Sequence, residues 1–385
     1  MPQNRTGNWL LFLIVFSQFA GTSLWFTGNA VINDLIQTRN IIVDIAWVTS
    51  AVLFGFISGT LVFAMFSIAD KFQSAWVFFI SCLIAALFNF FILWLADSSL
   101  ELFIFSFFTG FFLAGIYPVG MKIASDIFPK RTGNALGFLV GALVLGTAFP
   151  HLVKYYSSGF SFQSIITTSS LLAITGGFCV LMFIPKYKAG TSQYFNPKVI
   201  AGLFKSTPFK AAATGYFGHM WELYAFWAFI PFAIQLHNTI TGAELNIPLY
   251  SFLIIAAGSL GCIGGGIISR RAGSKAVASA ALIISAVCCL ISPFILHFDT
   301  FLFILFMLIW GISVVADSPQ FSALVATNVP ATTKGTALTF VTSVGFLISI
   351  VSIQMLEIFL EHFVEYGFWL LVPGPILGYI FLRRK

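Results

Sequence analysis

Long apolar runs, each close to the length of a membrane-spanning helix, follow one another along almost the whole chain. A helix of about 20 mainly apolar residues crosses the hydrocarbon core of a bilayer. Only 8% of the 385 residues are charged, which is too few to cover the surface of a water-soluble protein of this length. The sequence therefore predicts an all-α membrane protein.

Twelve of these runs are predicted to be transmembrane helices. Their approximate ranges are 9–32, 43–67, 74–96, 99–122, 134–156, 162–184, 210–236, 247–269, 276–297, 300–325, 335–358 and 366–382. A more polar stretch over 186–209 interrupts them. We expect an N-terminal bundle of six helices over 1–185, a cytoplasmic linker over 186–209, and a C-terminal bundle of six helices over 210–385.

The basic residues predict the orientation of the chain. With the N-terminus in the cytoplasm, all but two of the 19 lysines and arginines fall at cytoplasmic ends or loops, as the positive-inside rule requires. The two exceptions are Arg39 and Lys154. This asymmetry accounts for the net charge of +6 without a nucleic-acid partner. It predicts a multi-pass protein of the lipid bilayer with both termini in the cytoplasm.

The sequence contains none of the motifs that would indicate enzymatic or metal chemistry. The five cysteines all lie in apolar runs and lack metal-ligand spacing, so we interpret them as reduced packing residues. There is no Walker motif, no H-E-x-x-H and no nucleophile elbow. We therefore expect no enzyme activity, no cofactor and no metal site.

The two halves of the chain resemble each other in sequence. Residues 67–74 and 267–274 follow the second and eighth runs, 200 positions apart. Pro118 and Pro129 recur as Pro319 and Pro330, 201 positions further along. Parallel repeats of six helices are typical of secondary transporters that are built as two bundles.

The loop over 266–275 resembles the signature G-x-L-a-D-r-x-G-r-k of the major facilitator superfamily, with Arg270 where that signature has an acid. The first-half loop is similar at Asp70 and Lys71. The runs 115–120 and 316–321 resemble a bacterial subgroup of nitrate/cyanate-type carriers. The resemblance implies a bacterial inner-membrane transporter with two pseudo-symmetric six-helix bundles, for which a monomer is sufficient.

The resemblance also implies roles for particular residues. The first, fourth, seventh and tenth helices of this superfamily line the cavity, so the expected substrate contacts are Trp25, Asn29, Tyr117, Trp221 and Tyr224. The expected gating residues, which would pair across the inner side, are Asp70, Lys71, Asp126, Arg270 and Arg271. Ser106, four residues before Gly110, stands where many proton-coupled members have an arginine.

Ionisable residues at membrane depth are few. Such groups are costly to insert and are candidates for function by default. Glu222 lies near the middle of the seventh run, and His219, three residues earlier, shares its helix face. Asp317 lies in the tenth run. A carboxyl group in a low-dielectric medium holds a proton more readily than one in water, and an adjacent imidazole can share it. We therefore expect Glu222, His219 and Asp317 to couple protons to transport.

The leading hypothesis is a proton-coupled secondary transporter, a symporter, for a small organic solute. Two carboxyl groups and no cation at the midplane argue against an inorganic anion, in conflict with the nitrate/cyanate resemblance, and favour a neutral, zwitterionic or cationic solute. A proton-driven exporter of drugs or metabolites is an alternative, and a passive facilitator also remains open. The rivals from another class are a membrane-embedded enzyme and a non-transporting membrane sensor.

Overall fold

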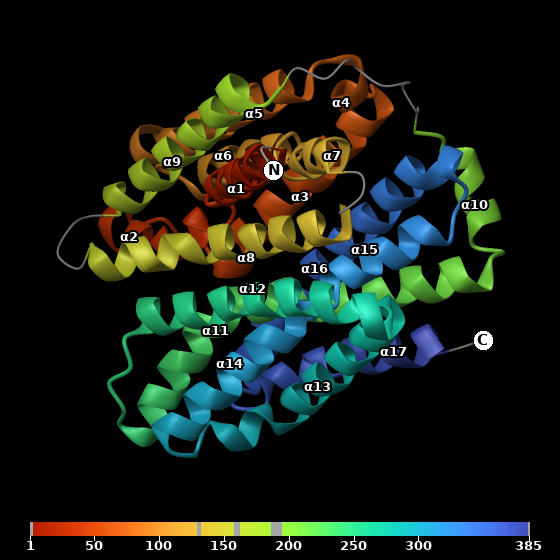
Figure 1. Ribbon diagram of the computed structural model, residues 1–385. Helices are drawn as coiled ribbons and strands as arrows, with labels where there is room; N and C mark the ends of the chain where they lie inside the picture. The colour runs from red at the N-terminus through yellow and green to blue at the C-terminus, as the bar shows by residue number, and fades with distance from the viewer. Residues whose placement is uncertain (1–2, 129–131, 158–161, 186–194, 384–385) are drawn as a thin grey trace. The chain divides into compact units, whose positions relative to one another are not determined.

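The computed structural model describes residues 3–128, 132–157, 162–185 and 195–383, and every regular element in these ranges is a helix (Figure 1). In chain order these are α1 (Gln3–Thr22), α2 (Thr27–Arg39), α3 (Ile45–Met65), α4 (Ile68–Lys71), α5 (Ser74–Leu95), α6 (Ser99–Leu113), α7 (Tyr117–Ile127), α8 (Thr132–Tyr156), α9 (Gln163–Phe183), η1 (Pro197–Val199), α10 (Ile200–Leu203), α11 (Thr207–Thr241), α12 (Ile247–Ala272), α13 (Ser274–Ile295), α14 (Thr300–Ala316), α15 (Ser318–Thr327), η2 (Ala331–Thr333), α16 (Lys334–His362), η3 (Gly367–Leu371) and α17 (Pro373–Arg383).

The chain folds into two compact units, Met1–Phe195 and Asn196–Lys385. In the first unit α1 packs against α8 and α9, and α3 packs against α6. In the second unit α11 packs against α16 and α17, and α12 packs against α14. The predicted linker over 186–209 lies partly outside the described residues, and its described part contains η1 and α10.

Ten segments of the described chain are long and apolar enough to cross a membrane, and they coincide with ten of the twelve predicted spans. The seventh predicted span is α11, which is about 52 Å long at 1.5 Å per residue but is not among the ten. Its centre carries His219 and Glu222, which lower its mean hydropathy. The twelfth corresponds to Gly367–Arg383, which is apolar but short of 20 residues. The count of twelve therefore stays a prediction.

Three of the ten predicted spans that coincide with long apolar segments are broken in the middle. The first is interrupted at residues 23–26 between α1 and α2, and the fourth at residues 114–116 between α6 and α7. The tenth is interrupted at Asp317, between α14 and α15. Pro118 and Pro319 stand within the first two residues of α7 and α15, where a missing N–H costs nothing. The repeated prolines therefore mark equivalent breaks in both units.

Glycines let paired helices approach to backbone contact in each unit. A Cβ on Gly110 of α6 would lie 2.0 Å from the carbonyl oxygen of Val52 in α3, and one on Gly55 would lie 1.9 Å from that of Phe107. In the second unit, a Cβ on Gly311 of α14 would lie 2.2 Å from the carbonyl oxygen of Ile254. Small residues at such crossings permit the close packing that holds helices together in lipid.

Both basic residues that break the predicted charge asymmetry have local partners. The Arg39 guanidinium lies 3.3 Å from Asp97 and donates hydrogen bonds to carbonyl groups at the end of α5, including that of Ala96 at 2.7 Å. Lys154 in α8 donates to Asp34 at 3.0 Å and to the carbonyl of Ala30 at 2.8 Å. Cations at the C-terminus of a helix are stabilised by the partial negative charge there. Local pairing thus explains the position of each exception.

Candidate functional site

Glu222 is buried inside the second unit, where α11 faces α13 and α14. Its side chain is 1% exposed. The carboxylate oxygen Oε1 accepts hydrogen bonds from the Ser285 hydroxyl, from the Cys289 thiol at 3.2 Å and from the Trp310 indole N–H at 2.6 Å. Ser285 and Cys289 lie four residues apart on one face of α13. Three donors therefore converge on one oxygen of a carboxyl group that is shielded from water.

His219 and Asp317 form a second buried pair. Nδ1 of His219 lies 2.8 Å from Oδ1 of Asp317, and the two side chains are 1% and 2% exposed. The distance is that of a salt bridge, although the orientation does not give Oδ1 a hydrogen bond of good geometry. Nε2 of His219 is buried and makes no hydrogen bond to any described residue. Asp317 occupies the break between α14 and α15, so the helix break positions the carboxyl group beside α11.

The three ionisable groups lie on neighbouring elements, but their pairing differs from the one that the sequence predicts. The sequence favours His219 as the partner of Glu222, whereas the imidazole contacts Asp317 and Glu222 is held by α13 and α14. Glu222 lies on α11 and Asp317 at the break between α14 and α15, and α11 packs against both of these helices. Among the described residues, no lysine or arginine forms a salt bridge with either of them.

The expected substrate contacts lie in separate places within their units. In the first unit, Trp25 lies in the break between α1 and α2 with its ring 4.9 Å from that of Phe56. Asn29 donates from Nδ2 to the Thr49 hydroxyl at 2.7 Å. Tyr117 is the first residue of α7 and is half-buried. Trp25, Asn29 and Tyr117 thus lie in or next to helix breaks.

In the second unit, Trp221 contacts η3 and Tyr224 contacts α16, whereas Glu222 is held by α13 and α14. The Trp221 indole N–H donates to the carbonyl of Leu370 in η3 at 2.9 Å. The Tyr224 ring lies 5.1 Å from that of Phe346 in α16. A role of Trp221 and Tyr224 in substrate binding stays a prediction, as it does for the three residues of the first unit.

The expected gating residues are at the ends of helices. Asp70 in α4 forms a salt bridge of 2.6 Å with Lys122 of α7, which also donates to the carbonyl of Ala69 at 2.5 Å. Asp126, one turn after Lys122, is within electrostatic reach of both. Lys71 is exposed, and so are Arg270 and Arg271, which belong to the last turn of α12. The partner of Asp70 is thus a residue that the sequence did not single out.

Charge reversal tests whether the Asp70–Lys122 pair stabilises the first unit. We expect Asp70→Lys and Lys122→Asp each to lower the melting temperature of the purified protein, because like charges then meet in a partly buried position. The double exchange restores opposite charges, and we expect a coupling energy of about 0.5–3 kcal/mol in a double-mutant cycle. A double variant whose loss equals the sum of the two single losses would rule this role out.

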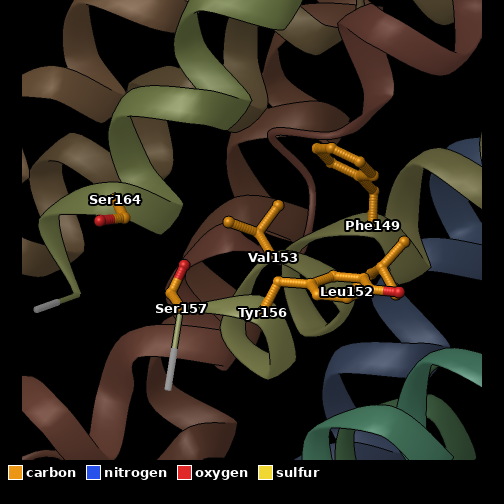
Figure 2. A pocket seen from close by; sticks show the side chains of 6 residues that line it. All are labelled: Phe149, Leu152, Val153, Tyr156, Ser157 and Ser164. Carbon is orange, nitrogen blue, oxygen red and sulfur yellow. The ribbon is translucent and has the colours of Figure 1, made fainter. Parts of the chain in front are cut away.

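One pocket of about 420 Å³ lies in the first unit, at the C-terminal end of α8 (Figure 2). Figure 2 shows that most of its lining comes from α8 and the residue that follows it, and that Ser164 comes from α9. The lining residues are Phe149, Leu152, Val153, Tyr156, Ser157 and Ser164. None of these side chains is a carboxylic acid, a histidine or a cation, so the pocket offers no proton-coupling chemistry.

The groups that hold the ionisable residues are not apparent from the sequence. Ser285, Cys289 and Trp310 surround Glu222, yet each belongs to an apolar run whose composition resembles that of any packed membrane helix. Only the meeting of α11, α13 and α14 identifies them. The spacing of Ser285 and Cys289 on one helix face was the single signal in the sequence.

The fold and the buried site are those of a multi-pass helical membrane protein, and comparison with known proteins gives its family. The family model described as "Major Facilitator Superfamily" matches residues 10–353. The chain therefore belongs to the major facilitator superfamily and is a transporter, as the loop over 266–275 predicts.

A solved structure supports the fold. The chain is similar to a mutant of the nucleoside transporter NupG, with a TM-score of 0.71 and 15% sequence identity, over 97% of this chain and 98% of that one. At this level of identity the likeness concerns the fold alone. No curated protein matches the chain in sequence.

Proposed function

We propose that this protein is a secondary active transporter that moves a small organic solute across the bacterial inner membrane by alternating access, in symport with protons. The observation that carries the proposal is the buried set of ionisable groups in the second unit. Glu222 is the coupling group, and Asp317 with His219 assists it. In this proposal twelve spans form two six-helix bundles, both termini are cytoplasmic, and the protein acts as a monomer.

The chemistry of the buried set supports proton coupling. A carboxyl group with no cation beside it can be neutral inside the membrane and ionised when water reaches it. An imidazole that contacts a carboxyl group on one nitrogen can carry a proton on the other. Glu222 of α11 and Asp317 at the break before α15 are both buried on elements that pack against each other, an arrangement in which two carboxyl groups disfavour simultaneous ionisation. These properties suit a site that binds and releases a proton once in each transport cycle.

The same charges support an uncharged, zwitterionic or cationic solute. An inorganic anion would meet two carboxyl groups, and among the described residues neither carboxyl group has a lysine or arginine as its salt-bridge partner. The helix breaks bring polar side chains such as Ser23 and Asp317 to the middle of the spans, where solutes bind in many transporters. Nucleosides are worth including among the candidates, because a similar structure is that of a nucleoside transporter.

Counterflow in proteoliposomes tests the proposal. The panel contains labelled amino acids, sugars, polyamines, organic acids, nucleosides and nitrate. We expect one organic class to exchange. If one proton accompanies one solute, its internal concentration should exceed the external one about tenfold for each pH unit by which the outside is more acidic. Accumulation driven by the opposite gradient would make the protein an exporter. Exchange of nitrate alone, or no response to any pH gradient, would contradict the proposal.

A further inference from the structure

Gln18 is a buried residue of α1 whose polar atoms are not used by the fold. Its side chain is 0% exposed, and neither Oε1 nor Nε2 has a hydrogen-bond partner among the described residues. A buried amide that leaves both its donor and its acceptor unpaired destabilises a protein, and most buried polar groups are therefore paired. The carboxamide of Gln18 calls for an explanation other than stability.

The amide oxygen lies against the backbone of α7. A Cβ added to Gly120 would be 2.0 Å from Oε1 of Gln18, so a side chain at position 120 is incompatible with the observed place of the amide. On the other side, the Phe78 ring of α5 lies close to the same point. The side chain of Gln18 thus lies where α1 meets α5 and α7, and the missing side chain of Gly120 leaves room for its amide.

The offset of 201 positions that relates Pro118 to Pro319 pairs the surroundings of Gln18 with positions in the second unit. His219 and Phe321, whose rings are 6.0 Å apart, lie 201 positions after Gln18 and Gly120. Asp317 lies the same 201 positions after Ile116. His219 therefore has a carboxyl partner, whereas the residue of the first unit at the position equivalent to Asp317 is an isoleucine, which offers no polar atom.

A second pair of equivalent positions extends the pattern. A Cβ on Gly21 would lie 2.6 Å from the Ile116 side chain and 3.4 Å from the thiol of Cys82 in α5. Glu222 lies 201 positions after Gly21, and it interacts with Asp317 and with residues of α13. The two units thus share one arrangement, which is ionisable in the second unit and neutral in the first.

We propose that Gln18 is a specificity-determining residue that binds an uncharged group of the solute carrying a hydrogen-bond donor beside an acceptor, such as a carboxamide, a lactam or the edge of a nucleobase. This inference rests on the proposed transport function and names its substrate class. A carboxamide presents its N–H and its carbonyl in one plane, so a matching group forms two parallel hydrogen bonds with it. Such a site rejects analogues that lack one partner, because the buried amide is then left unpaired.

The break between α6 and α7 supplies the movement that exposes the amide. The backbone N–H groups of Ala114 and Gly115 bond to the carbonyls of Phe111 and Phe112, three residues back, at 3.3 and 2.9 Å. A short 3₁₀ stretch inside a helix is a common hinge. Rotation of α7 at this hinge moves Gly120 away from Gln18 and opens the amide to a solute.

The test measures binding and stability of the full chain in detergent, with nicotinamide and uracil as probes and 3-acetylpyridine as the matched compound without an N–H donor. We expect at least one of the two probes to raise the melting temperature of the wild type, and 3-acetylpyridine to bind at least about tenfold more weakly. In Gln18→Leu, which keeps the volume, probe affinity falls at least about tenfold while the protein without probe melts about 2 °C higher. Gln73→Leu, at an exposed glutamine, serves as the control and changes neither quantity.

Each other outcome overturns the inference. Unchanged probe affinity in Gln18→Leu means that the amide does not contact the solute, and a lower melting temperature with unchanged affinity assigns Gln18 to the fold alone. If neither probe binds the wild type, the proposed substrate class, with a hydrogen-bond donor beside an acceptor, is ruled out. The proposed transport function fails separately, if Gln18-dependent binding is present but accumulation ignores the pH gradient.

Discussion

Replacement of Glu222 by glutamine is expected to abolish proton-driven accumulation and to leave solute exchange intact. Glutamine has nearly the volume of glutamate, and its carbonyl oxygen can accept the hydrogen bonds that Ser285 and Trp310 now donate to Oε1. The packing of α11 against α13 and α14 is therefore preserved. The amide cannot take up or release a proton, so the transport cycle loses its link to the pH gradient.

The size of this effect follows from thermodynamics. With one proton for each solute, a gradient of one pH unit holds about a tenfold concentration ratio in the wild type, and the ratio falls to about one in the variant. Counterflow and gradient-driven uptake, measured in the same proteoliposomes, separate exchange from coupling. Glu244→Gln, at an exposed glutamate beyond the end of α11, is the matched control. Normal accumulation by Glu222→Gln would remove Glu222 from the coupling mechanism.

Addition of one methyl group at Gly110 is expected to prevent correct folding of the first unit. A Cβ at this position would lie 2.0 Å from the carbonyl oxygen of Val52 and 2.8 Å from its carbonyl carbon, and backbone atoms cannot rotate out of the way. Helices α3 and α6 must therefore separate along their whole crossing. We expect Gly110→Ala to cost at least about 3 kcal/mol, at the upper end for overpacked interiors.

The measurement is the yield of monodisperse protein in size-exclusion chromatography, followed by its melting temperature. Gly264→Ala in α12 is the matched control, because nothing lies within 4 Å of the added Cβ and alanine favours a helix by up to about 1 kcal/mol over glycine. Gly311→Ala, 201 positions after Gly110, is expected to damage the second unit in the same way, through the carbonyl of Ile254. Native yield and stability of Gly110→Ala would show that α3 and α6 pack differently.

The helices themselves were predictable because membrane-spanning segments are local. A run of about 20 apolar residues satisfies its backbone hydrogen bonds internally and needs no distant partner to be recognised. Ten predicted spans accordingly coincide with apolar helices of the described chain. The seventh is the exception in composition, because Glu222 and His219 lower the hydropathy of α11 although its helix runs unbroken from Thr207 to Thr241.

The breaks within helices were only partly predictable. Pro118 and Pro319 are visible signals, since proline is favoured in the first turn of a helix. Proline alone does not locate a break, however, because Pro231 lies inside α11, which is unbroken. The break at residues 23–26 contains no proline, and its sequence is as apolar as the helices on either side. Its position is therefore not marked in the sequence.

The sequence by itself determined the class of the protein, the position of most spans, the repeat, and the presence of three costly ionisable residues at membrane depth. The composition, the spacing of the repeat and the charge distribution are properties of the linear sequence, so they can be determined without knowing which residues are in contact. The tertiary structure alone decided the partners. It paired His219 with Asp317 and surrounded Glu222 with Ser285, Cys289 and Trp310. It also left the Gln18 amide without a hydrogen-bond partner among the described residues. Such pairings join residues far apart in the chain through the packing of whole helices.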